Sequence, residues 1–284
     1  MSTLFDTAPL RASPVLRKAL AIGLRLPRAA LRPWPSAAHA RPPVLVNSIP
    51  KSGTHLVLQL ARALPETHYW GTFIATTPSL TLRPRTPEAL ARRLGRLLPG
   101  EVAGAHLFHS QNSETALRAS GVLHLFVCRD PRDVLLSEAH YLATMNRWHR
   151  MHRPFRRLDD PTARLRLAIE GFDARYPSCE QRLAPYLGWL AAPDTLVLRY
   201  EDFFGPARAK TLARISAAFA SRARWPGDQQ ALAARLATAI APQKSHTFHT
   251  GGTQKWRTAY DPATLRRANQ RLGPVLAALG YPES

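Results

Sequence analysis

The chain has 284 residues and carries 39 Lys and Arg against 19 Asp and Glu, a formal net charge of +20. This length suits one large α/β domain or two small ones, and a hydrophobic fraction of 45% is ordinary for a packed core. The basic balance favours anionic partners, but the positive charges are spread along the chain and form no recognised nucleic-acid module. Two cysteines, Cys128 and Cys179, argue against a disulfide framework and predict a reducing, cytoplasmic compartment.

Residues 1–43 differ from the rest of the chain, because seven Lys and Arg residues there accompany a single acid, Asp6. Residues 15–26 fit a short basic amphipathic helix, whose apolar run is too short to span a bilayer. We expect a loosely docked or disordered tail, with peripheral attachment to the inner face of the membrane as the alternative. One domain would then occupy residues 44–284.

Strand and helix patterns alternate from Val44 onward. The expected strands are 44–48, 102–107, 122–128 and 195–199. The expected helices are 53–63, 87–98, 113–119, 131–145, 161–172, 177–191, 206–220, 227–240 and 261–279. The Pro-rich residues 65–88 are expected to form a variable region. Such alternation predicts an α/β protein of three layers, α/β/α, in which helices cover both faces of a mostly parallel central sheet.

The most informative motif is 49–54, which reads Ile-Pro-Lys-Ser-Gly-Thr between an expected strand and an expected helix. Backbone N–H groups at a helix N-terminus bind anions, so a tight turn here predicts a phosphate cradle. Lys51 adds a point charge, and Ser52 and Thr54 add hydroxyl donors. The motif is not a Walker loop, in which the Lys follows the second Gly. An ordinary strand–turn–helix junction is the plain alternative.

A second candidate anion site follows the expected strand 122–128. Arg129 stands at the end of this strand, and Pro131 suits the first turn of the next helix, with Asp130 as its cap. The guanidinium offers a planar, permanently charged fork for phosphate, and Ser137 offers a neutral donor from the helix. For Arg129 alone, a surface ion pair with Asp130 would be the simpler interpretation.

Together, the two motifs resemble the phosphate sites of the sulfotransferases that use 3′-phosphoadenosine-5′-phosphosulfate (PAPS), and the composition looks like that of a bacterial member. The family's loop reads Pro-Lys-Ser-Gly-Thr, and its 3′-phosphate site has an Arg at a strand end and a Ser eight residues later. The resemblance implies a P-loop NTPase-like sulfotransferase fold, with PAPS as sulfonate donor and no metal. It implies a 5′-phosphosulfate loop made of Lys51, Ser52, Gly53, Thr54 and His55. It also implies that Arg129 and Ser137 bind the 3′-phosphate.

Two weaker matches lie nearer the C-terminus. Tyr200 follows an expected strand in a Tyr-Glu-Asp sequence, as does a family Tyr that contacts the adenine, although a half-buried packing role fits equally well. The family's closing loop resembles 247–256, where Gly251 and Gly252 could bind an anion through their backbone amides. The Arg-Lys pair of that loop is replaced here by His249 and Thr250, so its grip on the 3′-phosphate is in doubt, and Lys255 or Arg257 is the alternative source of charge.

Sulfuryl transfer needs a cation at the leaving phosphate and a base at the attacking hydroxyl. Lys51 is the implied cation. His106 ends an expected strand in a His-Leu pair, as the family's catalytic base does, and His109 is its rival. A carboxylate base, or none, stays open. Lys51, His106, Arg129 and Tyr200 all follow strands, so a parallel sheet would bring them to one edge.

The resemblance implies transfer of a sulfonate group to a hydroxyl or amine, and the acceptor stays open between a carbohydrate, a glycolipid and a small hydroxylated metabolite. A P-loop-like nucleotide kinase is one alternative function. A non-catalytic basic protein that binds nucleotide or nucleic acid is another. The sequence does not predict the oligomeric state.

Overall fold

The computed structural model describes residues 16, 19–20, 22–24, 41–240 and 252–283. Most of the expected basic tail therefore lies outside the described residues, as do His249, Thr250 and Gly251 of the expected closing loop. Within the described part of the chain, no helix combines the length and apolar character that crossing a membrane would need.

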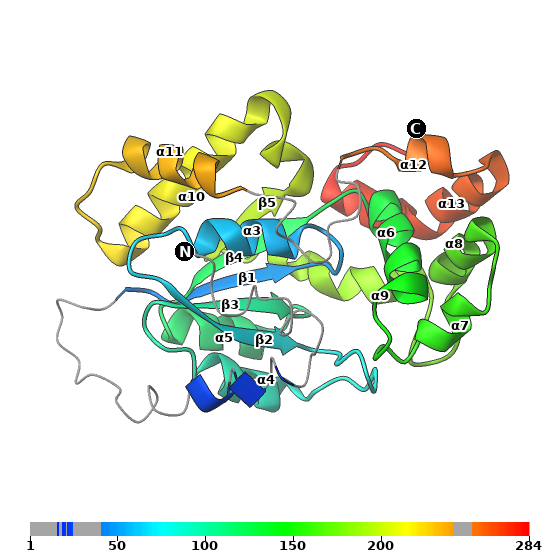
Figure 1. The fold of residues 1–284 in the computed structure, drawn as a ribbon, viewed down its shortest axis with the longest axis horizontal. Helices are drawn as coiled ribbons and strands as arrows, with labels where there is room; N and C mark the ends of the chain where they lie inside the picture. The colour runs from blue at the N-terminus through cyan, green and yellow to red at the C-terminus, as the bar shows by residue number, and fades with distance from the viewer. Residues whose placement is uncertain (1–15, 17–18, 21, 25–40, 241–251, 284) are drawn as a thin grey trace.

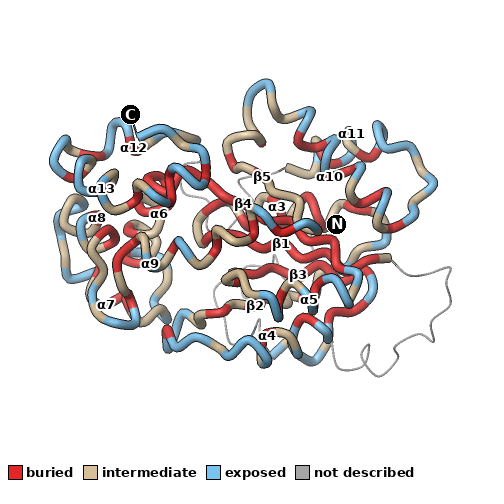
Figure 2. Tube along the Cα trace, turned by 180° about the vertical axis from the view of Figure 1, so that it is seen from behind, coloured by how far each residue is buried: buried red, intermediate tan, exposed pale blue. Residues whose placement is uncertain are grey.

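A sheet of five parallel strands forms the middle layer, in the order β2-β3-β1-β4-β5. The strands are β1 (Val44–Ser48), β2 (His68–Ala75), β3 (Glu101–His106), β4 (Leu123–Cys128) and β5 (Thr195–Arg199). The three middle strands β3, β1 and β4 are buried almost throughout, which Figure 2 shows as a red band through the molecule. Burial on both faces explains why these strands read as continuous apolar runs. The expected α/β fold with a parallel sheet is confirmed.

Strand β2 was missing from the sequence-based expectation, which gave residues 65–88 only as a variable region. The strand lies at the edge of the sheet, and its pairing with β3 shifts register between Tyr69 and Phe73. The bulge, with Gly71 at a positive φ of 74°, interrupts the two-residue alternation that identifies a half-buried strand. The strand therefore depends on its pairing with β3, and its own sequence does not show a clear strand pattern.

Two separate apolar clusters pack against the two faces of the sheet. Alternate residues of β1 divide between them, because Leu45 belongs to one cluster and Val44 and Val46 belong to the other. Helix α3 (Thr54–Ala61) packs on the second face with α10 (Arg208–Ala223) and α11 (Gln229–Ala239). Helices α4 (Pro87–Leu94) and α5 (Gln111–Ala119) cover the first face (Figure 1). The structure thus has the three expected layers.

A further group of helices lies beyond the carboxyl ends of the strands (Figure 1). Its α-helices are α6 (Pro131–Thr144), α7 (His152–Arg156), α8 (Pro161–Glu170), α9 (Cys179–Leu183), α12 (Trp256–Ala259) and α13 (Pro262–Leu279). The single helix expected at 177–191 is divided into α9 and a 3₁₀ segment, η2 (Ala184–Leu190), near Pro185. Proline has no N–H for the α-helical ladder and clashes with the preceding turn, which accounts for the change.

Candidate active site

The loop between β1 and α3 has an unusual backbone conformation. Lys51 has a φ of 69° and Gly53 a φ of 95°, and the turn closes through a hydrogen bond from Ser52 N to Ile49 O of 3.1 Å. Left-handed backbone at a residue other than glycine is costly and clusters at binding sites. Gly53 is the N-cap of α3, and no side chain caps this helix. The first N–H groups of α3 are therefore turned toward whatever lies in the loop.

Tyr200 closes this loop from the end of β5. A Cβ atom built on Gly53 would lie 2.4 Å from the Tyr200 ring, so the ring packs directly on the glycine backbone. The same ring lies under the guanidinium of Arg129, with 4.4 Å from Cζ to the ring centroid. One aromatic side chain thus contacts both motifs that the sequence singled out, and it brings them to neighbouring places at the edge of the sheet.

Replacing Gly53 with alanine should destabilise the protein by about 1–3 kcal/mol, because a Cβ there meets both a positive φ and the Tyr200 ring. Chemical denaturation measures this change. Gly121→Ala is the matched control, since Gly121 also has a positive φ of 61° but has no atom within 4 Å of the added Cβ. Equal losses in the two variants would contradict the contact between Gly53 and Tyr200.

His106 is fixed at the end of β3 by the end of β1. Its Nδ1 lies 2.9 Å from the carbonyl oxygen of Ser48 and 3.2 Å from Ser48 Oγ, which lies 2.6 Å from Thr54 Oγ1. Because a carbonyl oxygen can only accept, Nδ1 carries the proton in the neutral ring and Nε2 keeps its lone pair. Phe73 of β2 packs edge-on against the ring at 4.9 Å between centroids. Burial lowers the pKa of His106 to about 4, against the opposing effect of the Ser48 carbonyl.

Lys51 reaches across the loop to helix α6. Its Nζ lies 3.8 Å from the centroid of the Tyr141 ring, a cation–π contact that orients the side chain. Burial lowers the pKa of Lys51 to about 8; Glu138, also on α6, raises it, and Arg129 lowers it. These influences place Glu138 and Arg129 within electrostatic reach of the Lys51 ammonium group.

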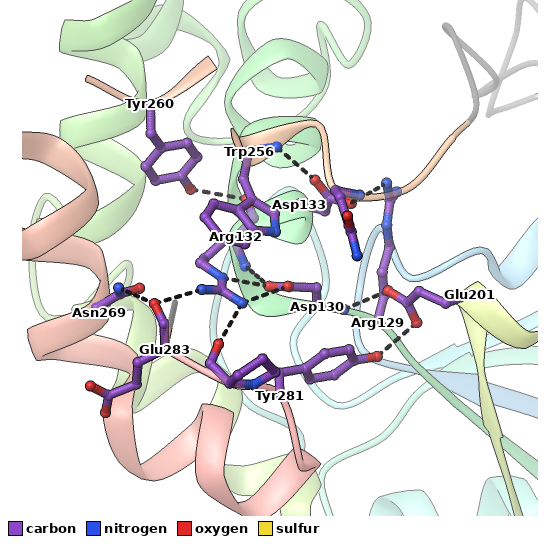
Figure 3. Close-up of polar contacts among 12 residues, drawn as sticks. Arg129, Asp130, Arg132, Asp133, Glu201, Trp256, Tyr260, Asn269, Tyr281 and Glu283 are labelled. Atoms are coloured by element: carbon purple, nitrogen blue, oxygen red, sulfur yellow. Dashed lines mark hydrogen bonds and ion pairs between the residues drawn. The ribbon is translucent and has the colours of Figure 1, made fainter. Parts of the chain in front are cut away.

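Arg129 is nearly buried, and its charge is partly compensated. Its Nη2 donates to Asp133 Oδ2 at 3.0 Å (Figure 3) and also to the carbonyl oxygen of Gly252 at 2.9 Å. The alternative interpretation of Arg129 as the partner of Asp130 is wrong. Asp130 instead caps α6 by accepting a hydrogen bond from the backbone N–H of Arg132, and it forms an ion pair with the buried Arg132 guanidinium at 2.8 Å. The side chain of an N-cap residue faces the first N–H groups of its helix, which turns Asp130 toward Arg132.

One face of α6 connects the two motifs. Asp133, Ser137 and Tyr141 are spaced four residues apart, so they lie along one side of the helix over about 12 Å. Asp133 contacts Arg129 and Tyr141 contacts Lys51, which leaves the half-buried Ser137 between the two cations. Sequence reasoning included Ser137 but missed Asp133 and Tyr141, although the four-residue spacing within 133–141 was available as a signal.

The other candidate residues have less direct places. His109, the rival base, bonds Glu114 at 3.2 Å and packs against Trp189. The carbonyl oxygen of Gly252 accepts a hydrogen bond from Arg129, and anion binding by its backbone amide stays a prediction. His55 lies in the first turn of α3, directly after the loop. Within the described residues, no group of three or more His, Cys, Asp or Glu side chains is arranged to hold a metal ion.

Comparison with known proteins identifies the fold. No protein-family model and no curated protein matches the sequence. Among solved structures, mouse sulfotransferase SULT7A1 complexed with PAP matches with a TM-score of 0.59 and 16% identity, over 92% of this chain and 90% of that one. The chain has the sulfotransferase fold. A structure of retinol dehydratase in complex with androsterone and inactive cofactor PAP matches with a TM-score of 0.50 and 17% identity, covering 89% of this chain and 85% of its own.

The predicted sulfotransferase fold, with its parallel sheet between helical layers, is therefore confirmed. At 16% identity the comparison concerns the course of the chain and assigns no role to any residue. The roles of Lys51, His106, Arg129, Ser137 and Tyr200 must be argued from their own surroundings.

Proposed function

We propose that this chain is a sulfotransferase that moves a sulfonate group from PAPS to a hydroxyl or amine of an acceptor. The observation that carries the proposal is the pair of cationic half-sites, Lys51 with its loop and Arg129 with Ser137, which Tyr200 and one face of α6 hold side by side. A donor with phosphate groups at both ends of an adenosine needs two such half-sites, whereas a single phosphate chain needs one. The solved structures with this fold contain PAP, as their names state.

The donor groups present fit such a nucleotide. Ser52 Oγ and Arg129 Nε are buried without a hydrogen-bond partner within the part of the chain that the structure describes. Buried polar atoms of this kind are costly unless a ligand satisfies them. Lys51 and the N–H groups at the start of α3 complete a 5′ half-site, and Arg129 with the Ser137 hydroxyl forms a 3′ half-site. Tyr200 lies between them, with its ring packed on Gly53 and under the guanidinium of Arg129.

Bound PAPS would supply an activated sulfuryl group and a phosphate as the leaving group. Nε2 of His106 would accept the proton of the attacking hydroxyl, since Nδ1 is committed to the Ser48 carbonyl. The Lys51 ammonium would stabilise the negative charge that develops on the leaving oxygen. The Tyr141 ring holds that ammonium in place before any ligand arrives, so little reorganisation would be needed.

The pH dependence of the free enzyme should reflect two shifted groups. Lys51 must stay protonated, so kcat/KM should fall as the pH rises through its pKa of about 8. A lysine with the ordinary pKa of 10.5 would keep its proton well beyond that pH. His106 must be neutral, so it should limit the rate only as the pH falls through about 4. Rate profiles measure the basic limb, and an NMR titration of the His106 ring measures the acidic one. Titration of that ring near 6.5 would contradict the lowering of the His106 pKa by burial.

The proposed function is tested first by ligand-induced thermal stabilisation. Adenosine 3′,5′-bisphosphate should raise Tm, and ATP with Mg²⁺ should raise it much less, because ATP has no 3′-phosphate for Arg129. Transfer of labelled sulfonate from PAPS into a cell extract, followed by mass spectrometry of the product, would then identify the acceptor. Stabilisation by ATP with Mg²⁺ and none by the bisphosphate would favour the kinase alternative. Steeply salt-dependent DNA binding with no response to either nucleotide would favour the nucleic-acid alternative.

A further inference from the structure

Asp133, in the first turn of α6, is a fully enclosed carboxylate that accepts hydrogen bonds from three directions. Oδ2 accepts from Arg129 Nη2 at 3.0 Å and from the backbone N–H of Gln254 at 2.9 Å. Oδ1 accepts from the backbone N–H of Trp256 at 3.1 Å. A buried carboxylate is tolerated only when such donors compensate its charge, so the carboxylate and its donors fix one another's positions. Asp133 therefore fastens the segment 252–256 to the guanidinium of Arg129 (Figure 3).

The same segment brings a second cation to Arg129. The Gly252 carbonyl accepts from Arg129 Nη2, and a Cβ built on Gly252 would lie 3.2 Å from Cε of Lys255. The half-buried Lys255 side chain therefore folds back over the residue that Arg129 contacts. Burial lowers the pKa of Lys255, Arg129 lowers it further, and Asp133 raises it, which agrees with this proximity. The two cations are therefore close enough to interact, and Asp133 offsets part of their charge.

A second Arg–Asp pair fixes the segment from its other side. Arg132 pairs with Asp130, stacks on the Trp256 ring at 3.7 Å, and donates to the carbonyl oxygens of Pro282 and Glu283 (Figure 3). The backbone of Trp256 is thus held by Asp133 and its ring by Arg132. Because both pairs arise from the first turn of α6, the segment keeps a defined position over Arg129.

We propose that Asp133 is a positioning residue that holds Arg129 and Lys255 as a two-cation clamp for a terminal phosphate monoester, the 3′-phosphate of adenosine 3′,5′-bisphosphate. This inference rests on the proposed function, since it specifies which residues recognise one end of that nucleotide. In the clamp, Lys255 supplies a cation from the residues that follow His249 and Thr250. Asp133 binds no ligand itself, because its oxygens are occupied by Arg129 and the two backbone N–H groups.

The test compares two nucleotides that differ by the clamped group. Dissociation constants for adenosine 3′,5′-bisphosphate and for AMP, which lacks the 3′-phosphate, are measured by calorimetry on the full chain. Asp133→Asn and Lys255→Met should each reduce the preference for the bisphosphate at least tenfold. The affinity for AMP should change less than threefold, because the loop around Lys51 is untouched. General destabilisation would weaken both nucleotides together and leave their ratio unchanged.

Two variants serve as matched controls. Lys210→Met makes the same chemical change as Lys255→Met at an exposed position on α10, away from the segment 252–256. Asp194→Asn makes the same chemical change as Asp133→Asn, but in a half-exposed ion pair with Arg118. Asp194 directly precedes β5, so it lies at the amino ends of the parallel strands, away from the candidate site at their carboxyl ends. Both controls should keep the wild-type preference within twofold.

The possible failures are distinguishable. Wild-type protein that binds the bisphosphate no better than AMP would overturn the proposed function. Wild-type discrimination that survives unchanged in Lys255→Met would overturn the clamp, whether or not Asp133→Asn folds. Loss of discrimination in Lys255→Met but not in a folded Asp133→Asn would overturn the positioning role of Asp133.

Discussion

Lys51→Met should lower the rate of sulfonate transfer about 10³-fold, at the upper end of the range for removing one preorganised charge from a developing anion. Lys51 is held by the Tyr141 ring, whereas the nearby Arg129 donates to Asp133 and to the Gly252 carbonyl, so its guanidinium is committed to those acceptors. Methionine keeps much of the length and apolar contact of the lysine stem. Initial rates of labelled-sulfonate incorporation measure the effect.

Lys210→Met is the matched control for this variant. Lys210 is exposed on α10, so its loss removes the same charge without touching the loop, and the rate should stay within twofold of wild type. Thermal unfolding separates catalysis from stability. Lys51→Met should not lower Tm, because it relieves the burial that depresses the pKa of Lys51. A folded Lys51→Met protein that keeps a tenth of the wild-type rate would contradict the role of Lys51 at the leaving oxygen.

His106→Gln should lower the transfer rate about 10²–10⁴-fold, the usual contribution of a general base. The amide of Gln can still donate to the Ser48 carbonyl, which preserves the anchor, but it offers no basic nitrogen at the place of Nε2. The acidic limb of the rate profile should disappear with the imidazole. Rates measured over the acidic range on both proteins provide the comparison.

The rival histidine provides the control for His106→Gln. His109 bonds Glu114 and packs against Trp189 and Gly188, so His109→Gln should change stability more than rate. If His109→Gln loses the activity and His106→Gln keeps it, the assignment of the base is wrong. If neither variant loses activity, a carboxylate or the solvent takes the proton.

Local chemistry predicted much of this site. Four features depend on neighbours within a few residues: the Lys51 loop, the end of β4 just before Arg129, Pro131 at the first position of α6, and the Asp130 cap. Signals of this kind survive folding because turn geometry, capping and helix entry are set by adjacent residues. The middle strands were predicted for a similar reason, since burial on both faces makes each one a continuous apolar run.

Contacts between distant segments were not predictable in the same way. Arg129 and Gly252 are 123 residues apart, and no local pattern says that Asp133 would accept two backbone N–H groups from the segment that contains Gly252. Strand β2 escaped detection because an edge strand with a bulge owes its form to its neighbour.

The amino-acid sequence alone determined the order of the buried strands and most of the helices, and the chemistry at the strand ends, because these arise from short-range sterics and burial patterns. The tertiary structure alone decided which charges meet. It separated Arg129 from Asp130, paired it with Asp133 and put the Tyr200 ring between Arg129 and Gly53. The physical reason is that ion pairs and ring contacts depend on distances between elements, and these distances are set only when the apolar faces pack.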